Sequence, residues 1–361
     1  HFPELELKLG LHKEKELQNI NNLNEKIKVL KPKKNITNNE TGSVTLWGVD
    51  YAIATTTFII RVSEGLTGSI PDTIGQLINL QYLYLFDNQL TGSIPDLSGL
   101  TSLERLILYN NQLTGSIPDL SGLNDLQNLA LYNNQLTGSI PNLSGLTSLE
   151  YLDLERNQLT GSIPDLSGLT SLEIVWFNDN QLTGSIPDLS GLTSLERLYL
   201  YNNQLTGSIP DLSGLTSLEF VWFSDNQLTG SIPDLSGLTS LLRLYVSNNK
   251  LSGPIPDNLP ATAYLNDNEF TGQIPASLAS LTWRTDRPLT LSGNYLDLTN
   301  VDPDIQTKID DGEIEAALQW EPNKKPEPIS KIWSSNSYLE APNNMVTVSY
   351  THLTLPTKRI V

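Results

Sequence analysis

The sequence predicts an α/β repeat solenoid, in which similar coils stack side by side into one continuous body. A segment of the form NQLTGSIPDLSGLTSLERLYLY recurs from Leu66 to about Leu298. Leucines occupy the same positions in each copy, so equivalent leucine side chains are expected to point into the core in every coil. An asparagine returns every 23 residues, at Asn88, Asn111, Asn134, Asn157, Asn180, Asn203, Asn226 and Asn249.

The copy from Leu192 to Pro210 shows how one coil is built. Leu198 and Leu200 are two residues apart, so both point to one face of a short strand. Leu192 and Leu195 precede that strand at the spacing of a tightly turning chain. One coil cannot bury these side chains alone, and stacking on its neighbours does so.

The turn that follows the strand predicts a structural role for the asparagines. The Asn203 amide can donate to and accept from main-chain groups that the turn leaves unpaired. Repetition in every coil predicts an asparagine ladder. Gly207 suits close backbone approach, Pro210 removes a donor where a second strand ends, and Asp211 can cap the next helical turn.

The consensus LxxLxLxxNxLxGxIP resembles the plant-type class of leucine-rich repeats over residues 66–298. The resemblance implies a right-handed superhelix with a concave parallel β-sheet, a second smaller sheet, and short 3-10 or helical turns on the convex side. It also implies a receptor-like recognition module, extracellular or at the cell surface. Secreted and surface proteins of plants and marine bacteria carry similar repeats.

Two segments precede the repeats. Residues 1–45 are rich in lysine and glutamate, and Leu11 to Leu30 can form one helix. Residues 46–65 resemble the amino-terminal cap of plant-type repeats, on the order Trp47-Gly48 and then a strand. Relatives usually carry a cysteine after that pair, whereas this chain has Asp50, so the cap lacks a disulfide.

The carboxyl-terminal part departs from the 23-residue period. Asn268 and Asn294 follow at intervals of 19 and 26 residues, as expected of a capping region. Residues 299–320 predict an acidic cap helix, and residues 321–346 a proline-rich linker or the start of a further module. Residues 347–361 resemble a translated sequencing adapter, so we interpret them as an artefact and the chain as a fragment of environmental origin.

Composition excludes several classes of function. A net charge of -18 argues against nucleic acid as a partner. The chain has no cysteine, and His1, His12 and His352 all lie outside the repeats, so we predict no enzyme, no metal and no cofactor. No apolar run is long enough to span a membrane, and we expect a monomer.

One column of strand residues predicts the binding surface. Four positions before each ladder asparagine stand Tyr84, Ile107, Ala130, Asp153, Trp176, Tyr199, Trp222, Tyr245 and, before Asn268, Tyr264. Five aromatic rungs would form an exposed strip of about 20 Å, with a protein or a carbohydrate as the expected ligand. Flanking columns add Phe86, Tyr109, Tyr132, Tyr201, Arg105, Arg197 and Arg243.

Other interpretations remain open at this point. The aromatics can serve only to stabilise the sheet by stacking, which would make the chain a structural spacer or adhesin stalk. Asp153 and Glu155 share one strand face, and we interpret them as a solvated or ion-paired patch rather than as catalytic carboxylates. A hydroxyl array on the other sheet could bind ice, through Thr91, Thr114, Thr137, Thr160, Thr183, Thr206 and Thr229. The carboxylates of Asp96, Asp119, Asp165, Asp188, Asp211 and Asp234 could bridge calcium or simply cap turns.

Overall fold

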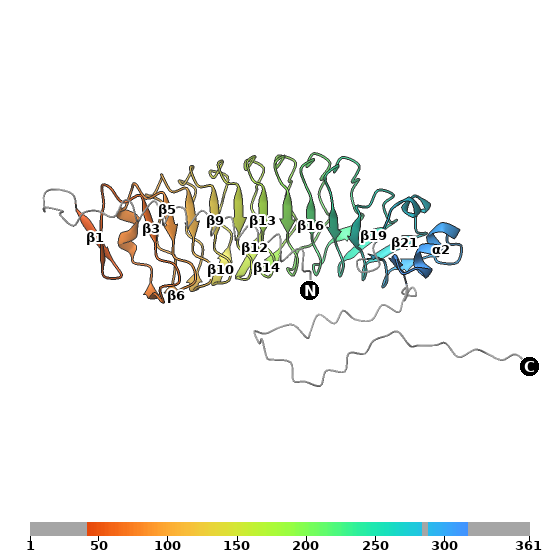
Figure 1. Ribbon diagram of the computed structural model, residues 1–361, viewed down its shortest axis with the longest axis horizontal. Helices are drawn as coiled ribbons and strands as arrows, with labels where there is room; N and C mark the ends of the chain where they lie inside the picture. The colour runs from red at the N-terminus through yellow and green to blue at the C-terminus, as the bar shows by residue number, and fades with distance from the viewer. Residues whose placement is uncertain (1–41, 284–287, 317–361) are drawn as a thin grey trace, which may run out of the picture.

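A computed structural model describes residues 42–283 and 288–316, which form one elongated solenoid whose coils stack from β1 to α2 (Figure 1). The predicted linker and adapter-like tail, and nearly all of the charged amino-terminal segment, lie outside the described residues. No helix among the described residues is long and apolar enough to cross a membrane.

The larger sheet holds one strand from each coil, and all its neighbours are parallel. Equal positions of successive coils face each other, as in the pairing of Trp176 with Tyr199 and of Tyr199 with Trp222. Its 12 strands are β3 (Phe58–Ile60), β5 (Tyr82–Tyr84), β7 (Arg105–Ile107), β9 (Asn128–Ala130), β11 (Tyr151–Asp153), β13 (Ile174–Trp176), β15 (Arg197–Tyr199), β16 (Phe220–Trp222), β18 (Arg243–Tyr245), β20 (Thr262–Tyr264), β22 (Leu289–Thr290) and β24 (Ile314–Glu315).

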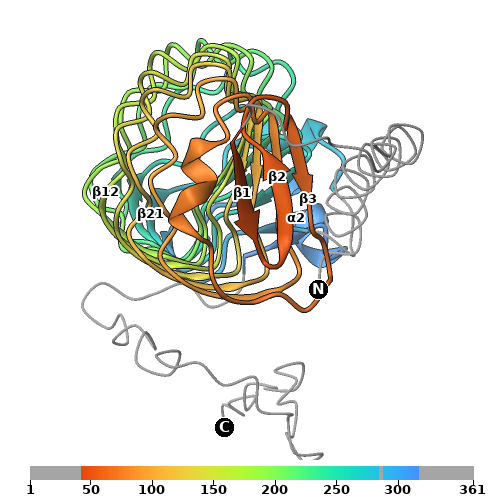
Figure 2. The ribbon, with the colours of Figure 1, turned by 90° about the vertical axis from the view of Figure 1, so that its left-hand side faces the viewer.

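A second parallel sheet lies on the opposite side of the coils, as the end-on view shows for β12 and β21 against β3 (Figure 2). Single bridges from Ser185 to Thr206 and from Ser208 to Thr229 connect its two parts. One part is β4 (Thr67–Ser69), β6 (Gln89–Gly92), β8 (Gln112–Gly115), β10 (Gln135–Ser139), β12 (Gln158–Ser162) and β14 (Gln181–Thr183); the other is β17 (Thr229–Gly230), β19 (Lys250–Gly253), β21 (Glu269–Gly272) and β23 (Tyr295–Leu296).

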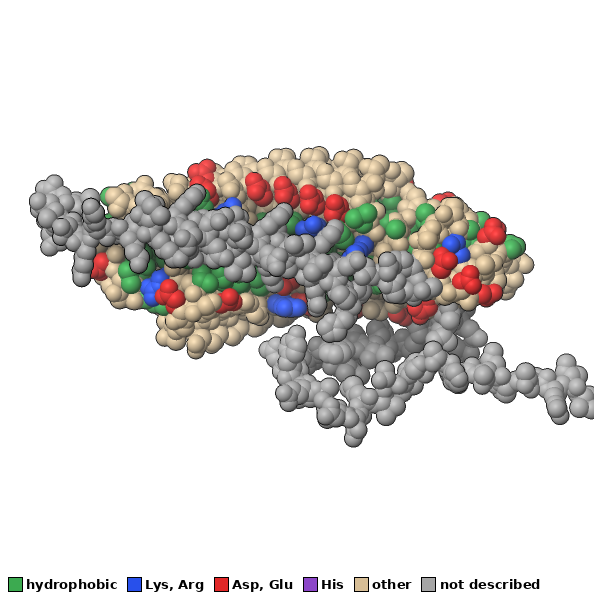
Figure 3. Space-filling view, viewed as in Figure 1, with side chains coloured by type: hydrophobic (Ala, Val, Ile, Leu, Met, Phe, Trp, Pro, Cys, Tyr) green, Lys and Arg blue, Asp and Glu red, His purple; other side chains and the backbone are tan. Residues whose placement is uncertain are grey.

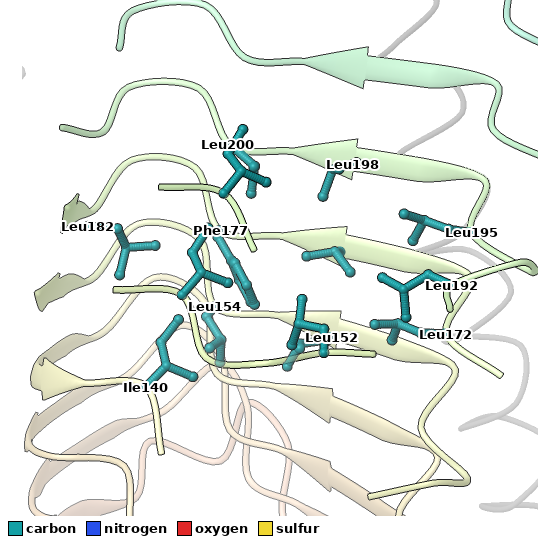
Figure 4. Close-up of a cluster of buried hydrophobic side chains, with 14 of the residues drawn as sticks. Ile140, Leu152, Leu154, Leu172, Phe177, Leu182, Leu192, Leu195, Leu198 and Leu200 are labelled. Atoms are coloured by element: carbon teal, nitrogen blue, oxygen red, sulfur yellow. The ribbon is translucent and has the colours of Figure 1, made fainter. Parts of the chain in front are cut away.

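Leucine side chains fill the space between the two sheets (Figure 4). Leu198 and Leu200 are each 1% exposed, and Leu192 and Leu195 are completely buried. Phe177 takes the place of a leucine in its coil and is buried as well. The inward-pointing leucines that the spacing predicted therefore form one continuous core.

Asparagine side chains join each coil to the preceding one. The Asn157 Oδ1 accepts a hydrogen bond of 3.0 Å from the Leu136 amide. Its Nδ2 donates to the carbonyls of Leu131, Leu154 and Glu155 at 3.1–3.2 Å. The same pattern recurs from Asn88 to Asn249 and continues at Asn268 and Asn294.

A second polar ladder, which was not predicted from the sequence, runs beside the first. The residue before each ladder asparagine from Asn88 to Asn268 has a φ of 51–57°, a conformation that asparagine and aspartate tolerate best among non-glycine residues. Asn133 donates to Asn110 at 2.7 Å, and Asn110 donates to Asp87 at 2.6 Å. Arg156 is the exception in this column of asparagine and aspartate.

The turns after the second sheet are simpler than predicted. Asp211 accepts from the Ser213 amide at 2.9 Å, and the Leu215 amide donates to the Leu212 carbonyl at 2.9 Å, which closes a single turn. In the described part of the chain, helices of the 3-10 type occur only near the ends, as η1 (Asp72–Gln76) and η2 (Ala276–Ser280). No cluster of three metal-ligating side chains exists among residues 42–283 and 288–316.

An antiparallel hairpin of β1 (Ser43–Leu46) and β2 (Val49–Ala52) stands at the start of the stack. Thr45 donates a hydrogen bond to the Asp50 carboxylate across this hairpin. The hairpin begins at Ser43, three residues before residue 46, where the sequence placed the start of the cap.

The carboxyl-terminal helix is shorter than the predicted span of residues 299–320. It is α2 (Pro303–Asp310), which packs near η2. Gly312 follows with a φ of 76°, the left-handed conformation that commonly ends a helix. The chain then becomes extended, and Ile314 pairs with Leu289 at the edge of the larger sheet.

Replacing Asn157 with alanine removes a hydrogen-bond partner from the Leu136 amide and from the carbonyls of Leu131, Leu154 and Glu155, of which the Glu155 carbonyl keeps the Asn133 amide. We expect the free energy of unfolding to fall by about 1–3 kcal/mol, the usual cost of an unpaired buried polar group. Urea unfolding of Asn157→Ala against Gln158→Ala, a truncation at the exposed neighbouring position, measures the effect. Equal stability of the two variants would contradict the ladder.

The turn aspartates predict acid sensitivity. Backbone and hydroxyl donation from Ser121 lowers the pKa of Asp119, and the equivalent serines lower the pKa of Asp96, Asp165 and Asp211. A carboxylate whose pKa is lower in the folded protein than in the unfolded chain stabilises the fold. This stabilisation is fully present above the unfolded pKa of about 3.9 and is lost as the pH falls through the folded pKa. The chain itself has asparagine at the equivalent position, Asn142. Changing the four aspartates to asparagine should reduce the loss of unfolding free energy between about pH 5 and pH 2. The same pH dependence in the variant and in the parent would refute this.

Candidate binding face

The candidate site is the face of the larger sheet that points away from the leucine core. Strand alternation creates it: in β13, Val175 points into the core, whereas Ile174 and Trp176 belong to a separate apolar cluster. We call the column from Tyr84 to Tyr264, with its flanking aromatics, the concave strip. The register aligns its members coil after coil.

The rings of the central column contact one another without a break from Trp176 onward. Trp176 stacks on Tyr199 with ring centroids 5.8 Å apart, and Tyr199 meets Trp222 edge-on at 6.1 Å. Trp222 meets Tyr245 at 5.4 Å, and Tyr245 stacks on Tyr264 at 4.6 Å. The predicted aromatic column is thus a row of adjacent rings.

The flanking column adds further stacks. Phe86 stacks on Tyr109 at 4.4 Å, and Tyr109 stacks on Tyr132 at 4.3 Å. Tyr201 stacks on Trp222 at 4.1 Å and so joins the flanking column to the central one. Such stacked pairs stabilise a sheet by about 0.5–1.5 kcal/mol each beyond area burial.

The predicted exposure of this strip is wrong for most of its members. Tyr84 is fully buried, Trp176 is 2% exposed and Tyr199 is 5% exposed. Burial also raises the pKa of the Tyr199 phenol. Strand alternation fixes which face a residue occupies, but it does not fix whether that face is covered. Tyr109, Tyr132 and Tyr245 are buried too, whereas Tyr201, Trp222 and Tyr264 are half-buried.

Asp153 interrupts the central column and is completely buried. It accepts from the Tyr151 hydroxyl at 3.0 Å and from the Glu155 amide at 3.1 Å. The predicted solvation is therefore wrong for Asp153, whereas Glu155 is half-buried. A carboxylate in such a place needs hydrogen bonds or a cation to offset its lost hydration.

The accessible part of the face contains two of the predicted arginines. Arg197 and Arg243 come from the strands on either side of Phe220, with guanidinium carbons 5.6 and 5.2 Å from its ring centroid. Both are partly exposed, in β15 and β18. Together with Trp222 and Tyr201 they form what we call the arginine cluster.

An acidic row that was not predicted from the sequence borders the strands. Backbone hydrogen bonds connect Glu150, Glu173, Glu196 and Glu219 in order, one per coil. Acidic side chains also form a row in the space-filling view (Figure 3). The signal was present in the sequence as glutamate at the position just before each of these strands.

The threonine array lies on the second sheet, away from the concave strip. All seven threonines from Thr91 to Thr229 are exposed. Each strand is offset from the next, so that Ser139 pairs with Thr160 and Ser162 with Thr183. This array forms a regular hydroxyl surface, and ice binding by it stays a prediction.

Because Trp176 is buried, its truncation tests packing rather than ligand contact. We expect Trp176→Ala to lower the free energy of unfolding by about 3–5 kcal/mol, as for other buried aromatics. Trp222→Ala, at the half-buried rung two coils further on, should cost less. Chemical denaturation of both variants measures this, and a smaller loss for Trp176→Ala than for Trp222→Ala would contradict the burial.

Known proteins show the same repeat and the same solenoid. The family model of Leucine Rich repeats (2 copies) matches residues 78–123, 124–168, 148–191, 170–214, 193–226 and 216–260. Among curated proteins nothing matches the chain. A crystal structure of a TDR receptor is 35% identical, with a TM-score of 0.59, over 64% of this chain and 42% of that chain.

Two further structures extend the comparison. The LRR ectodomain of the plant membrane receptor kinase GASSHO1/SCHENGEN3 from Arabidopsis thaliana, in complex with CASPARIAN STRIP INTEGRITY FACTOR 2, is 33% identical, with a TM-score of 0.57, over 71% of this chain and 34% of that chain. An LRR protein of Leptospira interrogans is 31% identical, with a TM-score of 0.53, over 71% of this chain and 64% of that one. The chain therefore spans less than half of either receptor. With its repeats matched from residue 78 to residue 260, the chain belongs to the leucine-rich-repeat family.

Proposed function

We propose that this solenoid is a non-enzymatic recognition module that binds a segment of a protein ligand along the concave face. The observation that carries the proposal is the arginine cluster: two partly exposed arginines lie over the buried Phe220 ring, and the half-buried Tyr201 and Trp222 stack on one another in the same group of strands. Arginine, tyrosine and tryptophan are the residues that most often dominate binding energy at protein interfaces. Carbohydrate, which can also stack on such rings, is the alternative ligand.

The comparisons support a protein ligand. The GASSHO1/SCHENGEN3 structure is a complex with CASPARIAN STRIP INTEGRITY FACTOR 2, and its repeats are similar to those of this chain. That structure is of an ectodomain, which supports our proposal of an extracellular or cell-surface location for this chain. A spacer without a ligand is the rival interpretation, in which the aromatic stacks only stabilise the sheet.

The absence of catalysis is part of the proposal. None of the three histidines lies within residues 42–316, and the chain has no cysteine. The buried Asp153 already accepts hydrogen bonds from Tyr151 and Glu155, which suits a structural role. The acidic row is aligned at strand spacing rather than grouped around a pocket.

A peptide-display library selected on the full-length chain tests this function. We expect Arg197→Ala combined with Arg243→Ala to weaken the selected peptides by at least about tenfold, because contacts at binding hot spots contribute about 2 kcal/mol or more. Arg156→Ala combined with Lys250→Ala removes the same charge outside the cluster and should retain binding. Failure to select any peptide, or equal loss in both double variants, would favour the spacer.

A further inference from the structure

One coil near the carboxyl-terminal end has a shorter turn than the regular coils. The interval from Pro256 to Thr262 is six residues, whereas the equivalent interval from Pro187 to Arg197 is ten. The regular turn carries three leucines, and the short turn carries only Leu259. Each coil buries its leucines against the coils on both sides, so the short turn takes apolar contacts away from both of its neighbours.

The leucines on either side of the short coil show this loss of contact. In the preceding coil Leu241 is half-buried, although its equivalents from Leu103 to Leu218 are all completely buried. In the following coil Leu281 ends η2 as Leu77 ends η1, and it is half-buried whereas Leu77 is completely buried. The short coil therefore leaves apolar surface on both neighbouring coils.

Leu242 is the most exposed member of this region, at 46%. Arg243 pairs with Thr262 in the register of β18 and β20, so Leu242 lies beside the exposed Ala261. Hydrophobic side chains are also visible next to the carboxyl-terminal end of the row of acidic side chains (Figure 3). Grouped apolar side chains with a polar border often mark interaction sites, unlike single ones. We call Leu241, Leu242 and Ala261 the short-coil patch.

The same leucine interrupts the acidic row and changes the charge around one arginine. Arg197 is bordered at this position by glutamates of its own coil and of both neighbouring coils. Arg243 is bordered only by Glu219 of the preceding coil, because Leu242 and Ala261 carry no charge. Of the two cations in the arginine cluster, Arg243 is therefore the one whose charge nearby glutamates offset least.

We propose that the ligand of this module is a protein segment in which a carboxylate lies close to a large apolar side chain. The carboxylate binds Arg243, and the apolar side chain packs on the short-coil patch. This inference rests on the proposed function and names the class of ligand. A neutral sugar supplies neither group, so the inference also separates a protein ligand from the carbohydrate alternative.

The geometry of the arginine cluster suits a carboxylate. The guanidinium carbon of Arg243 is 5.2 Å from the Phe220 ring centroid, and that of Arg197 is 5.6 Å from the same centroid. A contact with a ring uses the face of a guanidinium group, whereas its N–H donors lie in its plane and match the two oxygens of a carboxylate. Two cations at one ring together attract an anion more strongly than one does.

The short-coil patch supplies the apolar half of the site. An apolar side chain that packs on Leu242 removes both surfaces from water, which a glutamate at this position would oppose. Leu242 and Arg243 are consecutive, with Cα atoms about 3.8 Å apart. The two ligand groups must therefore be near each other in the ligand's own sequence, within about three residues.

Peptides selected by display on the full-length chain test this inference. We expect them to share an aspartate or glutamate within about three residues of a leucine, isoleucine or phenylalanine. Leu242→Glu should weaken such peptides at least about tenfold, because it removes the apolar contact and repels the peptide carboxylate. Ile78→Glu makes the same change at an apolar residue that is 55% exposed in the first coil, outside the patch, and should bind like the parent.

A second variant separates the apolar contact from charge repulsion. Leu242→Gln adds no charge, and other coils already carry glutamine or glutamate at this position, at Gln127 and Glu219, so we expect it to fold. It should also weaken the selected peptides, but a peptide whose own apolar residue is changed to alanine should bind parent and variant within about twofold of each other.

The outcomes distinguish this inference from the proposed function. Selected peptides that need Arg197 and Arg243 but bind Leu242→Gln as tightly as the parent would overturn the apolar half of the site and leave the recognition module standing. Selected peptides without a carboxylate would overturn the acidic half in the same way. Failure to select any peptide would remove the proposed function and this inference together.

Discussion

The asparagine hydrogen bonds are the constraint on which the rest of this structure depends. Each buried amide group bonds to backbone groups of its own coil and of the preceding one, as Asn157 does with Leu154 and Leu131. Unpaired backbone groups in a closed core are costly, so every coil must turn at the same place. Uniform turns give uniform coils. The second ladder of asparagine and aspartate reinforces the same turn on the outside.

Uniform coils bring equivalent residues into register, and this makes two different apolar layers from one sheet. Leucines meet on the inner face, and aromatic rings meet on the outer face. Both layers are built by repetition, so a change in one coil is felt chiefly by its two neighbours. The strip is therefore a structural layer as well as a candidate binding surface, which explains why its rings are so deeply buried.

The polar groups divide the outer face into parts with different chemistry. Glutamates border the strands from Glu150 to Glu219, and Asp153 lies buried in the column. Arg197 and Arg243 flank Phe220 at the open end. Under the proposed function, a ligand with acidic and aromatic groups suits the arginine cluster.

The sequence by itself determined the period, the turn asparagines and the assignment of residues to the inner or outer face, because these follow from local spacing repeated many times. It also indicated the columns of Tyr84 to Tyr264, since a parallel register aligns equal positions. Only the tertiary structure decided that Trp176 and Tyr199 are buried while Trp222 is half-buried, because burial depends on what lies over the sheet. Likewise, only the tertiary structure decided that the chain after α2 becomes a strand, because Ile314 pairs with Leu289 and continues the larger sheet. The spacing of residues in the sequence decides which face of the sheet a side chain occupies, and its neighbours in space decide how exposed it is.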